Sequence, residues 1–400
     1  MIVLVNTLTL GRQGVRHMNI VVLGHRGLGP TSRVYVNRLL PDGVIPENSL
    51  LAFEMALNNG AHGVELDVYL TSDNQVVVCR DDILDRNVDG YHSCWTANEQ
   101  SILGKISEKT LSELQLDKYS LGLGQKIPTL KSVIELMIEH KKLYGINFKL
   151  NIELQGNNLQ LAAYTWDIVR SYIAEQKNML QLDNFIVNSF NKELLIAYRI
   201  AEEDNPLLYP YAGDKTDLML GVFTQPLFGN DELFTNYVPV IQDAGVFTVK
   251  QKIDEKYLQT LIDEIKKYDI RYIDIVSADL RPNLLDICRR NSIKLAMAYN
   301  PLRSKTEYML QYPDCDITQI TYEELEKLQL FKLYTFAQNF PKEKFYYKTD
   351  NIVSTLKFLK ELRQADTSDN QCANNILASA LLFSTTSSND SATAKHSCNL

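Results

Sequence analysis

Short apolar segments alternate with amphipathic ones along the chain, and this alternation limits the possible folds more than any other feature. The clearest apolar segments cover residues 19–24, 63–70, 149–155 and 184–189, and helical periodicity fills most of the intervals. Repeated strand–helix units imply a parallel sheet with helices outside it. Further strands are expected at 75–80, 217–223, 270–276, 293–298 and 316–320. These are nine candidates, and a closed (β/α)8 barrel needs eight, so one late assignment is expected to be wrong.

The length of 400 residues suits one such barrel, because α/β barrels run past about 250 residues as a single unit. The barrel is expected over residues 19–364, after an N-terminal extension of residues 1–18. From residue 365 the sequence becomes polar and poor in core-forming side chains. Residues 365–400 are therefore expected to form a disordered, low-complexity tail. The predicted fold class is α/β, a TIM-type (β/α)8 barrel with that tail.

Composition excludes several classes of function. A net charge of −8, with no basic cluster, argues against a nucleic-acid partner. None of the six cysteines has C-x-x-C spacing, so a zinc site is not expected, and a reducing, cytoplasmic location is the simpler prediction. The apolar run at residues 1–5 is short and lacks a basic region before it, so it does not predict a signal peptide. No run reaches the roughly 18 apolar residues of a membrane helix, and secretion without a signal peptide stays open.

The strand at 63–70 carries the most informative chemistry. Glu65 and Asp67 are two residues apart, so both carboxylates point to the same side of a strand. Two carboxylates this close repel each other, and a cation between them relieves the repulsion. Oxygen ligands suit Mg²⁺ or Ca²⁺. For an isolated Glu-x-Asp pattern a solvated strand face is the simpler explanation, so the metal interpretation depends on the rest of the chain.

Two other predicted strands also end in reactive groups. His25 and Arg26 follow the first strand, and Glu153 lies near the end of the strand at 149–155. In a (β/α)8 barrel the carboxyl ends of the strands converge on one face, where active sites are built. Three carboxylates, one histidine and one arginine suit metal-assisted phosphoryl chemistry, in which the arginine holds phosphate oxygens and the histidine moves a proton.

Seven motifs occur in an order that resembles the glycerophosphodiester phosphodiesterase family. They are His-Arg-Gly (25–27), Pro-Glu-Asn (46–48), a glycine-led Glu-x-Asp-Val (60–68), Val-Val-x-x-Asp (77–81), Ile-Pro-Thr-Leu (127–130), Asn-Ile-Glu (151–153) and Ser-Phe (189–190). The resemblance weakens after about residue 205. The family's late Trp-Thr-Val-Asn and Thr-Asp-x-Pro signatures are matched only weakly, at residues 297–300 and 317–319.

This resemblance implies a TIM-type barrel that hydrolyses glycerophosphodiesters to glycerol 3-phosphate and an alcohol. It implies a divalent cation, Ca²⁺ or Mg²⁺, held by Glu65, Asp67 and Glu153. It also implies that His25 is one of two acid/base histidines, with Arg26 on the phosphate. The expected partner is a small glycerophosphodiester or a lysophospholipid-like substrate.

The chain departs from the family at two positions. The family has a histidine immediately before the aspartate that ends the third strand, and this chain has Arg80 there. The family commonly has a lysine two residues after the fourth-strand glutamate, and this chain has Gln155 there. Arginine stays protonated and cannot shuttle a proton. Our hypothesis is that Arg80 takes over the phosphate-clamping role of the missing lysine, with Gln155 beside the substrate, and that proton transfer is weakened.

Other residues are candidates for supporting roles. Glu47 and Asn48 open the first barrel helix, where Asn48 could equally be a helix cap. The segment 28–45 contains Arg33, Tyr35 and Arg38, which could contact a headgroup or could simply be solvated. His92 could replace the missing proton donor, but a surface loop histidine is the simpler interpretation.

Two classes of function therefore remain open. The first is a metal-dependent phosphodiesterase, with activity that Arg80 could impair. The second is a catalytically silent protein that binds a phosphodiester or a phospholipid headgroup in the same pocket. Cleavage by internal attack to a cyclic phosphate is a third, less favoured possibility, because it could need only one proton-shuttling histidine.

Overall fold

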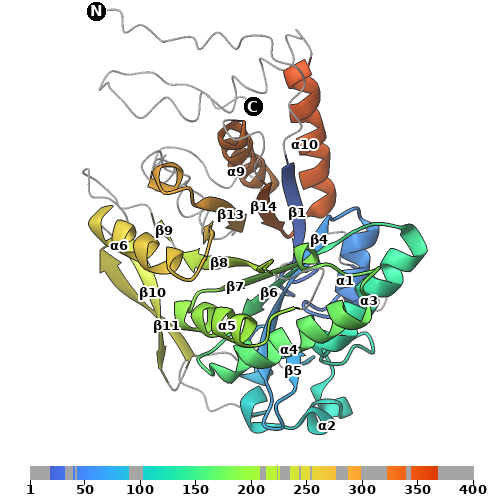
Figure 1. Cartoon of the computed structure of the whole chain (residues 1–400). Coiled ribbons are helices and arrows are strands. Elements are labelled where there is room, and N and C mark those ends of the chain that lie inside the picture. The colour runs from blue at the N-terminus through green and yellow to red at the C-terminus, as the bar shows by residue number, and fades with distance from the viewer. Residues whose placement is uncertain are drawn as a thin grey trace, which may run out of the picture.

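Parallel strands close into a barrel in this computed structural model (Figure 1). The structure describes residues 19–31, 39–40, 43–89, 102–207, 213–222, 224–225, 235–242, 245–252, 255–275, 287–298, 322–338 and 344–367. Within them, eight parallel strands form the barrel, which closes because β1 pairs with both β14 and β4. In spatial order the strands are β1 (Asn19–His25), β14 (Lys344–Thr349), β13 (Lys294–Ala298), β12 (Tyr272–Ile275), β8 (Asp217–Val222), β7 (Phe185–Ser189), β6 (Lys149–Leu154) and β4 (Gly63–Leu70). The predicted TIM-type barrel is confirmed.

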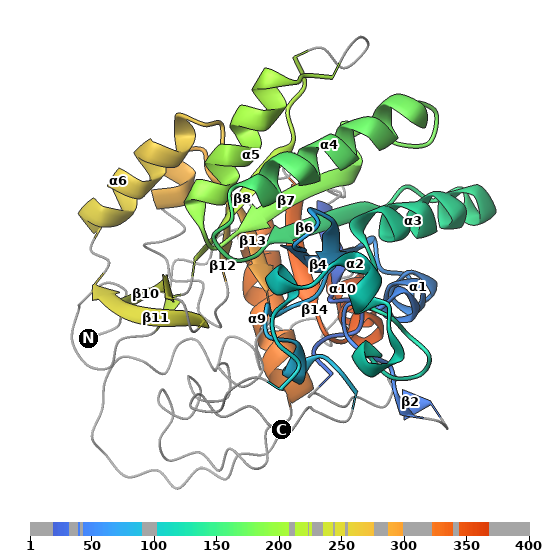
Figure 2. The same cartoon turned by 90° about the horizontal axis from the view of Figure 1, so that it is seen from below.

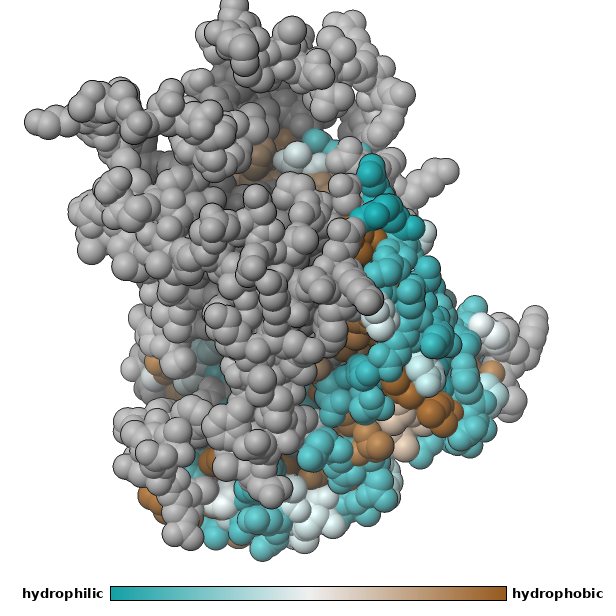
Figure 3. Space-filling model, turned by 90° about the vertical axis from the view of Figure 1, so that its left-hand side faces the viewer, coloured by the Kyte–Doolittle hydropathy of each residue, from teal (hydrophilic) through white to brown (hydrophobic). Residues whose placement is uncertain are grey.

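Helices surround the strands, as the view from below shows (Figure 2). The longer ones are α1 (Leu50–Asn58), α3 (Leu130–Tyr144), α4 (Gln160–Glu175), α5 (Lys192–Asp204), α6 (Glu255–Lys266), α9 (Tyr322–Ala337) and α10 (Ile352–Thr367). Short elements are α2 (Leu111–Leu114) and the 3₁₀ turns Leu84–Arg86, Ile106–Glu108, Asp117–Tyr119 and Leu182–Asn184. The coloured part of the face in Figure 3 is mainly hydrophilic with smaller hydrophobic areas, as expected for a helical layer that faces solvent.

Helix ends follow the capping signals of the sequence. The Ser49 side chain accepts a hydrogen bond from the Ala52 N–H and caps α1, so the cap is Ser49 and not Asn48. Thr129 caps α3 in the same way, by accepting from the Ser132 N–H. That helix ends at Gly145, whose φ of 70° is the left-handed conformation that glycine favours.

The strand predicted at 75–80 is not a barrel strand, which corrects our assignment. The structure has β5 (Val76–Val78) there, paired antiparallel with β4 through Val68, Tyr69 and Leu70. The connection between the two strands is a tight turn, and a parallel partner would have needed a crossover of about a dozen residues or more. The strand at 149–155, which we counted as the fourth, is therefore the third barrel strand. Together with α2, β5 lies at one end of the barrel (Figure 1).

The eighth barrel strand is β14, which the sequence analysis missed. It pairs with β1 from Asn19–Lys344 to Gly24–Thr349 and so closes the barrel. The candidate at 316–320 lies outside the described residues. The structure also contains small antiparallel sheets that the sequence did not predict: β2 (Leu39–Leu40) with β3 (Gly43–Val44), and β9 (Thr224–Gln225) with β10 (Thr235–Gln242) and β11 (Gly245–Lys252).

The two ends of the chain are described only in part. The described residues begin at 19, with β1, and end at 367, with α10. Residues 1–18 and 368–400 lie outside them, so the predicted extension and tail stay predictions. Among the described residues, none of the helices combines the length and the apolar character needed to span a membrane.

Candidate active site

The barrel interior consists of an apolar layer with a polar layer above it. The apolar layer contains Leu23, Ile186, Met219, Tyr272, Ala296 and Tyr346, which form a cluster separate from the main core. On four of these strands the residue two positions later is polar: His25, Asn188, Asp274 and Lys348. Because side chains on one face of a strand recur every second residue, these polar groups point into the barrel above an apolar floor.

A cluster of three carboxylates dominates this polar layer. Glu65, Asp67 and Glu153 each offer an oxygen within 4.8 Å of the others, and all three side chains are buried. The parallel register of β4 and β6 sets Asp67 directly beside Glu153. Burial raises the pKa of Glu65 well above its usual value, and the negative charge of Asp67 raises it further. The cluster therefore holds more negative charge than its surroundings stabilise.

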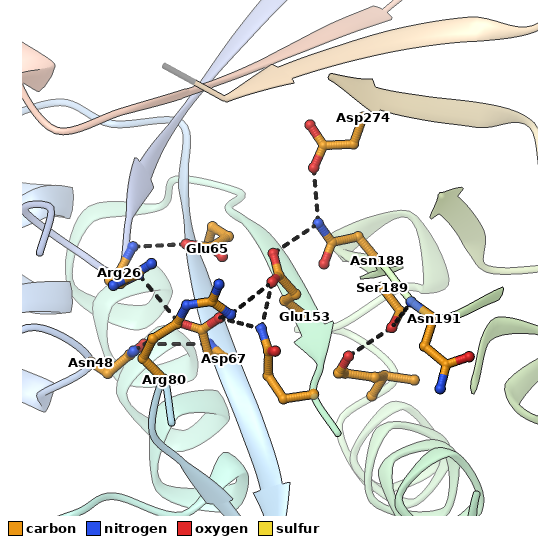
Figure 4. A network of polar contacts seen from close by, with 12 residues as sticks. Arg26, Asn48, Glu65, Asp67, Arg80, Glu153, Asn188, Ser189, Asn191 and Asp274 are labelled. Atoms are coloured by element: carbon orange, nitrogen blue, oxygen red, sulfur yellow. Dashed lines mark hydrogen bonds and ion pairs between the residues drawn. The ribbon is translucent and has the colours of Figure 1, made fainter. Parts of the chain in front are cut away.

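Arg80 lies against two of these carboxylates. Its Nη1 donates to Asp67 Oδ1 and to Glu153 Oε1, at 3.2 Å in each case (Figure 4). Burial would raise the pKa of Glu153, but Arg80 and neighbouring cations outweigh burial and lower it. For Asp67 burial prevails, and its pKa is raised despite Arg80. The predicted contact of Arg80 with phosphate stays a prediction, because here its guanidinium faces the carboxylates.

Gln155 contacts the same oxygens. Its Nε2 donates to Asp67 Oδ1 at 2.7 Å and also to Glu153. A neutral amide thus occupies the position where the family commonly has a lysine. It satisfies the acceptors without adding positive charge.

Arg26 and Asn48 bind the cluster from the side of β1. The Arg26 backbone N–H donates to Glu65 Oε2 at 2.8 Å, and its side-chain Nη1 pairs with Glu47 Oε1 at 3.0 Å. Asn48 donates from Nδ2 to Asp67 Oδ2 at 3.0 Å. Arg26 and Asn48 have φ values of 50° and 56°, a conformation that costs a non-glycine residue energy and that accumulates at functional sites.

His25 is held by a partner that the sequence analysis did not identify. Its Nδ1 lies 2.7 Å from Asp350 Oδ1, just after the end of β14. An ionised carboxylate only accepts, so Nδ1 carries the proton and Nε2 keeps a free lone pair. Burial lowers the pKa of His25, and Asp350 opposes this shift without cancelling it. Thr349 and Asp350 thus lie at the end of β14 and match the first two residues of the family's Thr-Asp-x-Pro signature, whereas residues 317–319 lie outside the described residues.

Three more residues complete the polar layer, and sequence reasoning missed all of them. Asn188 donates from Nδ2 to Glu153 Oε2 at 3.2 Å and to Asp274 Oδ2 at 3.0 Å. Lys348 donates to the same Asp274 carboxylate. Attraction to Asp274 and to Glu153 raises the pKa of Lys348 and outweighs the effect of burial. The only signal in the sequence was a single polar residue near the end of each of the apolar strands β7, β12 and β14.

The structure thus brings together those candidate site residues that it describes. His25, Arg26, Glu65, Asp67 and Glu153 lie at the carboxyl ends of β1, β4 and β6, with Arg80 and Gln155 against them. Glu47 and Asn48 support Arg26 and Asp67. Arg33, Tyr35, Arg38 and His92 lie outside the described residues.

These residues fit a divalent cation. Glu65 is buried and forms no ion pair with any residue that the structure describes, so its charge is compensated only in part, by Lys348 and Arg26 at longer range. Such a charge is stable only when it binds a proton or a cation. Carboxylate oxygens are the ligands that Mg²⁺ and Ca²⁺ prefer, so Glu65, Asp67 and Glu153 could hold either ion.

Fold and site together define a (β/α)8 barrel whose carboxyl-terminal face carries an acidic centre that could hold a cation, beside a carboxylate-held histidine. The model of the glycerophosphoryl diester phosphodiesterase family matches residues 25–272, which is more than half of the chain. The chain belongs to this family.

Individual relatives agree with this assignment. A glycerophosphodiester phosphodiesterase of Bacillus altitudinis is 30% identical over 216 residues, which cover 51% of this chain and 74% of that protein. One from Caldanaerobacter subterraneus is 32% identical over 144 residues, which cover 34% of this chain and about half (48%) of that protein.

Solved structures support the fold. Two structures whose names also refer to glycerophosphodiester phosphodiesterases, from Galdieria sulphuraria and Silicibacter pomeroyi, give TM-scores of 0.50 and 0.51. The matches cover 86% and 88% of this chain and 99% and 97% of those chains, at 14% and 15% identity. At such low identity they show the fold alone.

Proposed function

We propose that this protein hydrolyses glycerophosphodiesters to glycerol 3-phosphate and an alcohol, with the help of a divalent cation. The observation that carries the proposal is the convergence of Glu65, Asp67 and Glu153 with the His25–Asp350 pair on one face of the barrel. A bound Ca²⁺ or Mg²⁺ would polarise the phosphoryl group and stabilise the charge that develops on its oxygens. Both relatives described above are named as phosphodiesterases of this kind, which supports the substrate class.

His25 transfers the proton in this proposal. Asp350 holds Nδ1, which leaves Nε2 to accept or donate a proton at the reacting oxygen. Because burial lowers the pKa of His25, the ring is neutral at pH 7 and is ready to act as a base. A neutral ring also cannot form a competing ion pair with the nearby carboxylates.

Arg26 binds the phosphate. Its Nη1 is fixed by Glu47, but its buried Nε has no hydrogen-bond acceptor among the described residues, although Asp67 lies 3.4 Å away. A buried N–H without an acceptor is costly, and a phosphate oxygen would satisfy it. Arg26 therefore combines a fixed orientation with a donor that is still available.

Arg80 is expected to weaken catalysis. It stands where the family has a second acid/base histidine, and an arginine cannot exchange a proton at ordinary pH. Loss of one general acid/base lowers a rate by about 10²–10⁴-fold. A catalytically silent protein that binds a phosphodiester or a phospholipid headgroup is therefore the second candidate function, and Arg80 is the observation that favours it. The predicted cytoplasmic location stays a prediction.

Release of glycerol 3-phosphate from glycerophosphocholine and related diesters tests the proposal. The natural chain and an Arg80→His variant would be assayed with Mg²⁺, with Ca²⁺ and with a chelator. We expect slow, metal-dependent release by the natural chain and faster release by the variant. Turnover by the variant alone would favour the silent-binding candidate for the natural chain. If neither protein released glycerol 3-phosphate although both were folded, the proposed reaction would be contradicted.

A further inference from the structure

We infer that Arg80 is an internal counter-ion of the carboxylate cluster, which competes with the metal ion and is released to the substrate phosphate when the metal binds. This inference rests on the proposed function for its metal site. It assigns to Arg80 a role that couples two ligands: the metal takes the carboxylates, and the phosphate takes the guanidinium.

The contacts of Arg80 place a cation on two of the three proposed ligands. A single nitrogen, Nη1, donates to Asp67 Oδ1 and Glu153 Oε1, both at 3.2 Å (Figure 4). Both oxygens also accept from Gln155 Nε2, so their lone pairs are occupied. A metal ion that binds Asp67 Oδ1 or Glu153 Oε1 must therefore displace a hydrogen bond there, and Arg80 is the donor that also brings a competing positive charge.

Arg80 is able to leave, because it approaches the cluster from the open side. It follows β5, which runs back antiparallel along β4 and is not part of the closed barrel. A quarter of its side-chain surface (25%) is exposed, whereas at most 5% is exposed for Asp67 and Glu153. The carboxylates are fixed in the interior, and the guanidinium covers them from the solvent side.

Lys348 shows by contrast what a fixed counter-ion looks like in the same layer. Only 2% of its side chain is exposed, and its Nζ donates to Asp274, with Glu153 Oε2 3.8 Å away. It lies on the barrel strand β14 and is almost fully buried. Of these two cations beside Glu153, Arg80 is the exposed one, and it is therefore the one that we expect to exchange its partners.

The exchange makes metal and phosphate binding reinforce each other. Once released, the planar guanidinium keeps its positive charge and can bind phosphate oxygens through two parallel N–H groups. Phosphate that holds Arg80 in turn removes a competitor from the carboxylates, so each ligand raises the affinity for the other. The phosphate-clamping role expected from the sequence is thus reached only in the metal-bound state.

Calorimetric titration of the full chain with Ca²⁺ alone tests the competition directly. We expect the dissociation constant for Ca²⁺ to fall at least tenfold in Arg80→Gln, because a competing charge is removed. Arg80→Lys, which keeps the charge, should remain closer to the natural chain. Arg170→Gln is a matched control on α4, where Arg170 pairs with Asp167, and it should bind Ca²⁺ unchanged. Circular dichroism and thermal unfolding would verify that each variant is folded.

A second titration, with Ca²⁺ in the presence of saturating sn-glycerol 3-phosphate, tests the coupling. Direct contact between metal and phosphate contributes in every variant, so the informative quantity is the difference between variants. We expect glycerol 3-phosphate to strengthen Ca²⁺ binding several-fold more in the natural chain than in Arg80→Gln. Equal enhancement in both proteins would overturn the release of Arg80 to phosphate.

The outcome is separable from that of the proposed reaction, because no turnover is measured. Equal or weaker Ca²⁺ binding by Arg80→Gln would overturn the inference even if the natural chain releases glycerol 3-phosphate. Absence of Ca²⁺ binding by all the proteins would overturn both the inference and the metal site itself. Tighter binding by Arg80→Gln without any turnover would support the inference and leave the protein as a binding protein.

Discussion

The two sides of the barrel mouth both carry buried polar residues, but they differ in how completely their charges are paired. On β4 and β6, the carboxylates Glu65, Asp67 and Glu153 crowd together, and Arg80, which contacts two of them, is partly exposed. On β7, β12 and β14, Asn188, Asp274 and Lys348 form a buried network that also contacts Glu153. We call the first set the acidic side and the second the paired side. The difference indicates that the acidic side is built to receive a ligand, and the paired side to hold the acidic side in place.

The largest expected effect comes from removing a carboxylate on the acidic side. Glu153→Gln should lower kcat/KM by about 10⁴-fold, about 5.4 kcal/mol, because the proposed metal loses a charged ligand. The measurement is the initial rate of glycerol 3-phosphate release at saturating metal. Glu139→Gln, an exposed change on α3, is the matched control and should have no effect. Activity within tenfold of the natural chain would show that Glu153 is not a ligand.

Breaking the paired side should instead affect stability. Lys348→Met leaves Asp274 as a buried charge that has lost its cation, which costs about 3–5 kcal/mol of unfolding free energy. Urea denaturation measures this loss. Adding Asp274→Asn to Lys348→Met should recover part of it, because the unpaired charge is then removed. If the single variant were as stable as the natural chain, the contrast between the two sides would fail.

Loss of the carboxylate that holds His25 should alter the pH dependence of catalysis. Asp350→Asn should lower kcat/KM about 10- to 100-fold. This loss is smaller than the roughly 10²–10⁴-fold that general acid/base catalysis contributes, because His25 itself remains. Asp350 raises the pKa of His25, so its loss lowers that pKa further. Activity needs the neutral ring, so the acidic limb of the pH profile should move to lower pH. A limb that stays in place would show that Asp350 does not act through His25.

The smallest expected effect separates local stability from the site chemistry. Ser49→Ala removes the cap of α1 and should cost about 1 kcal/mol of unfolding free energy. Asn48 precedes Ser49 but binds Asp67 through its own side chain, so affinity for Ca²⁺ should not change. Thermal unfolding and calorimetry give the two quantities. Weaker Ca²⁺ binding would mean that the cap also positions the acidic side.

The acidic side could be predicted from sequence because its residues lie in dense local motifs. Glu65 and Asp67 share one strand face, and Arg26 directly follows His25, so local spacing already implies that they act together. The paired side offers no such pattern. Asn188, Asp274 and Lys348 are single polar residues on apolar strands that are far apart in sequence, and only closure of the barrel brings them together.

Two errors in the strand assignment had physical causes. The segment at 75–80 reads as a buried strand, but its short turn after β4 permits only an antiparallel partner. β14 contains Phe345, Tyr346 and Tyr347, and this aromatic segment was not recognised as a barrel strand. Because β14 was not assigned, Asp350, which follows it and orients His25, was not predicted as a site residue either. The contacts of Arg80 could not be predicted either, because they depend on where β5 ends relative to β6.

The central claim is that Glu65, Asp67 and Glu153 form one cation site that Arg80 covers in the metal-free protein. Anomalous diffraction from crystals grown with Mn²⁺, compared with crystals grown with a chelator, tests it most directly. The account predicts a single strong peak among the three carboxylates, with the Arg80 guanidinium moved off Asp67 and Glu153. No peak there, with Arg80 still bound to both carboxylates at saturating Mn²⁺, would contradict the claim.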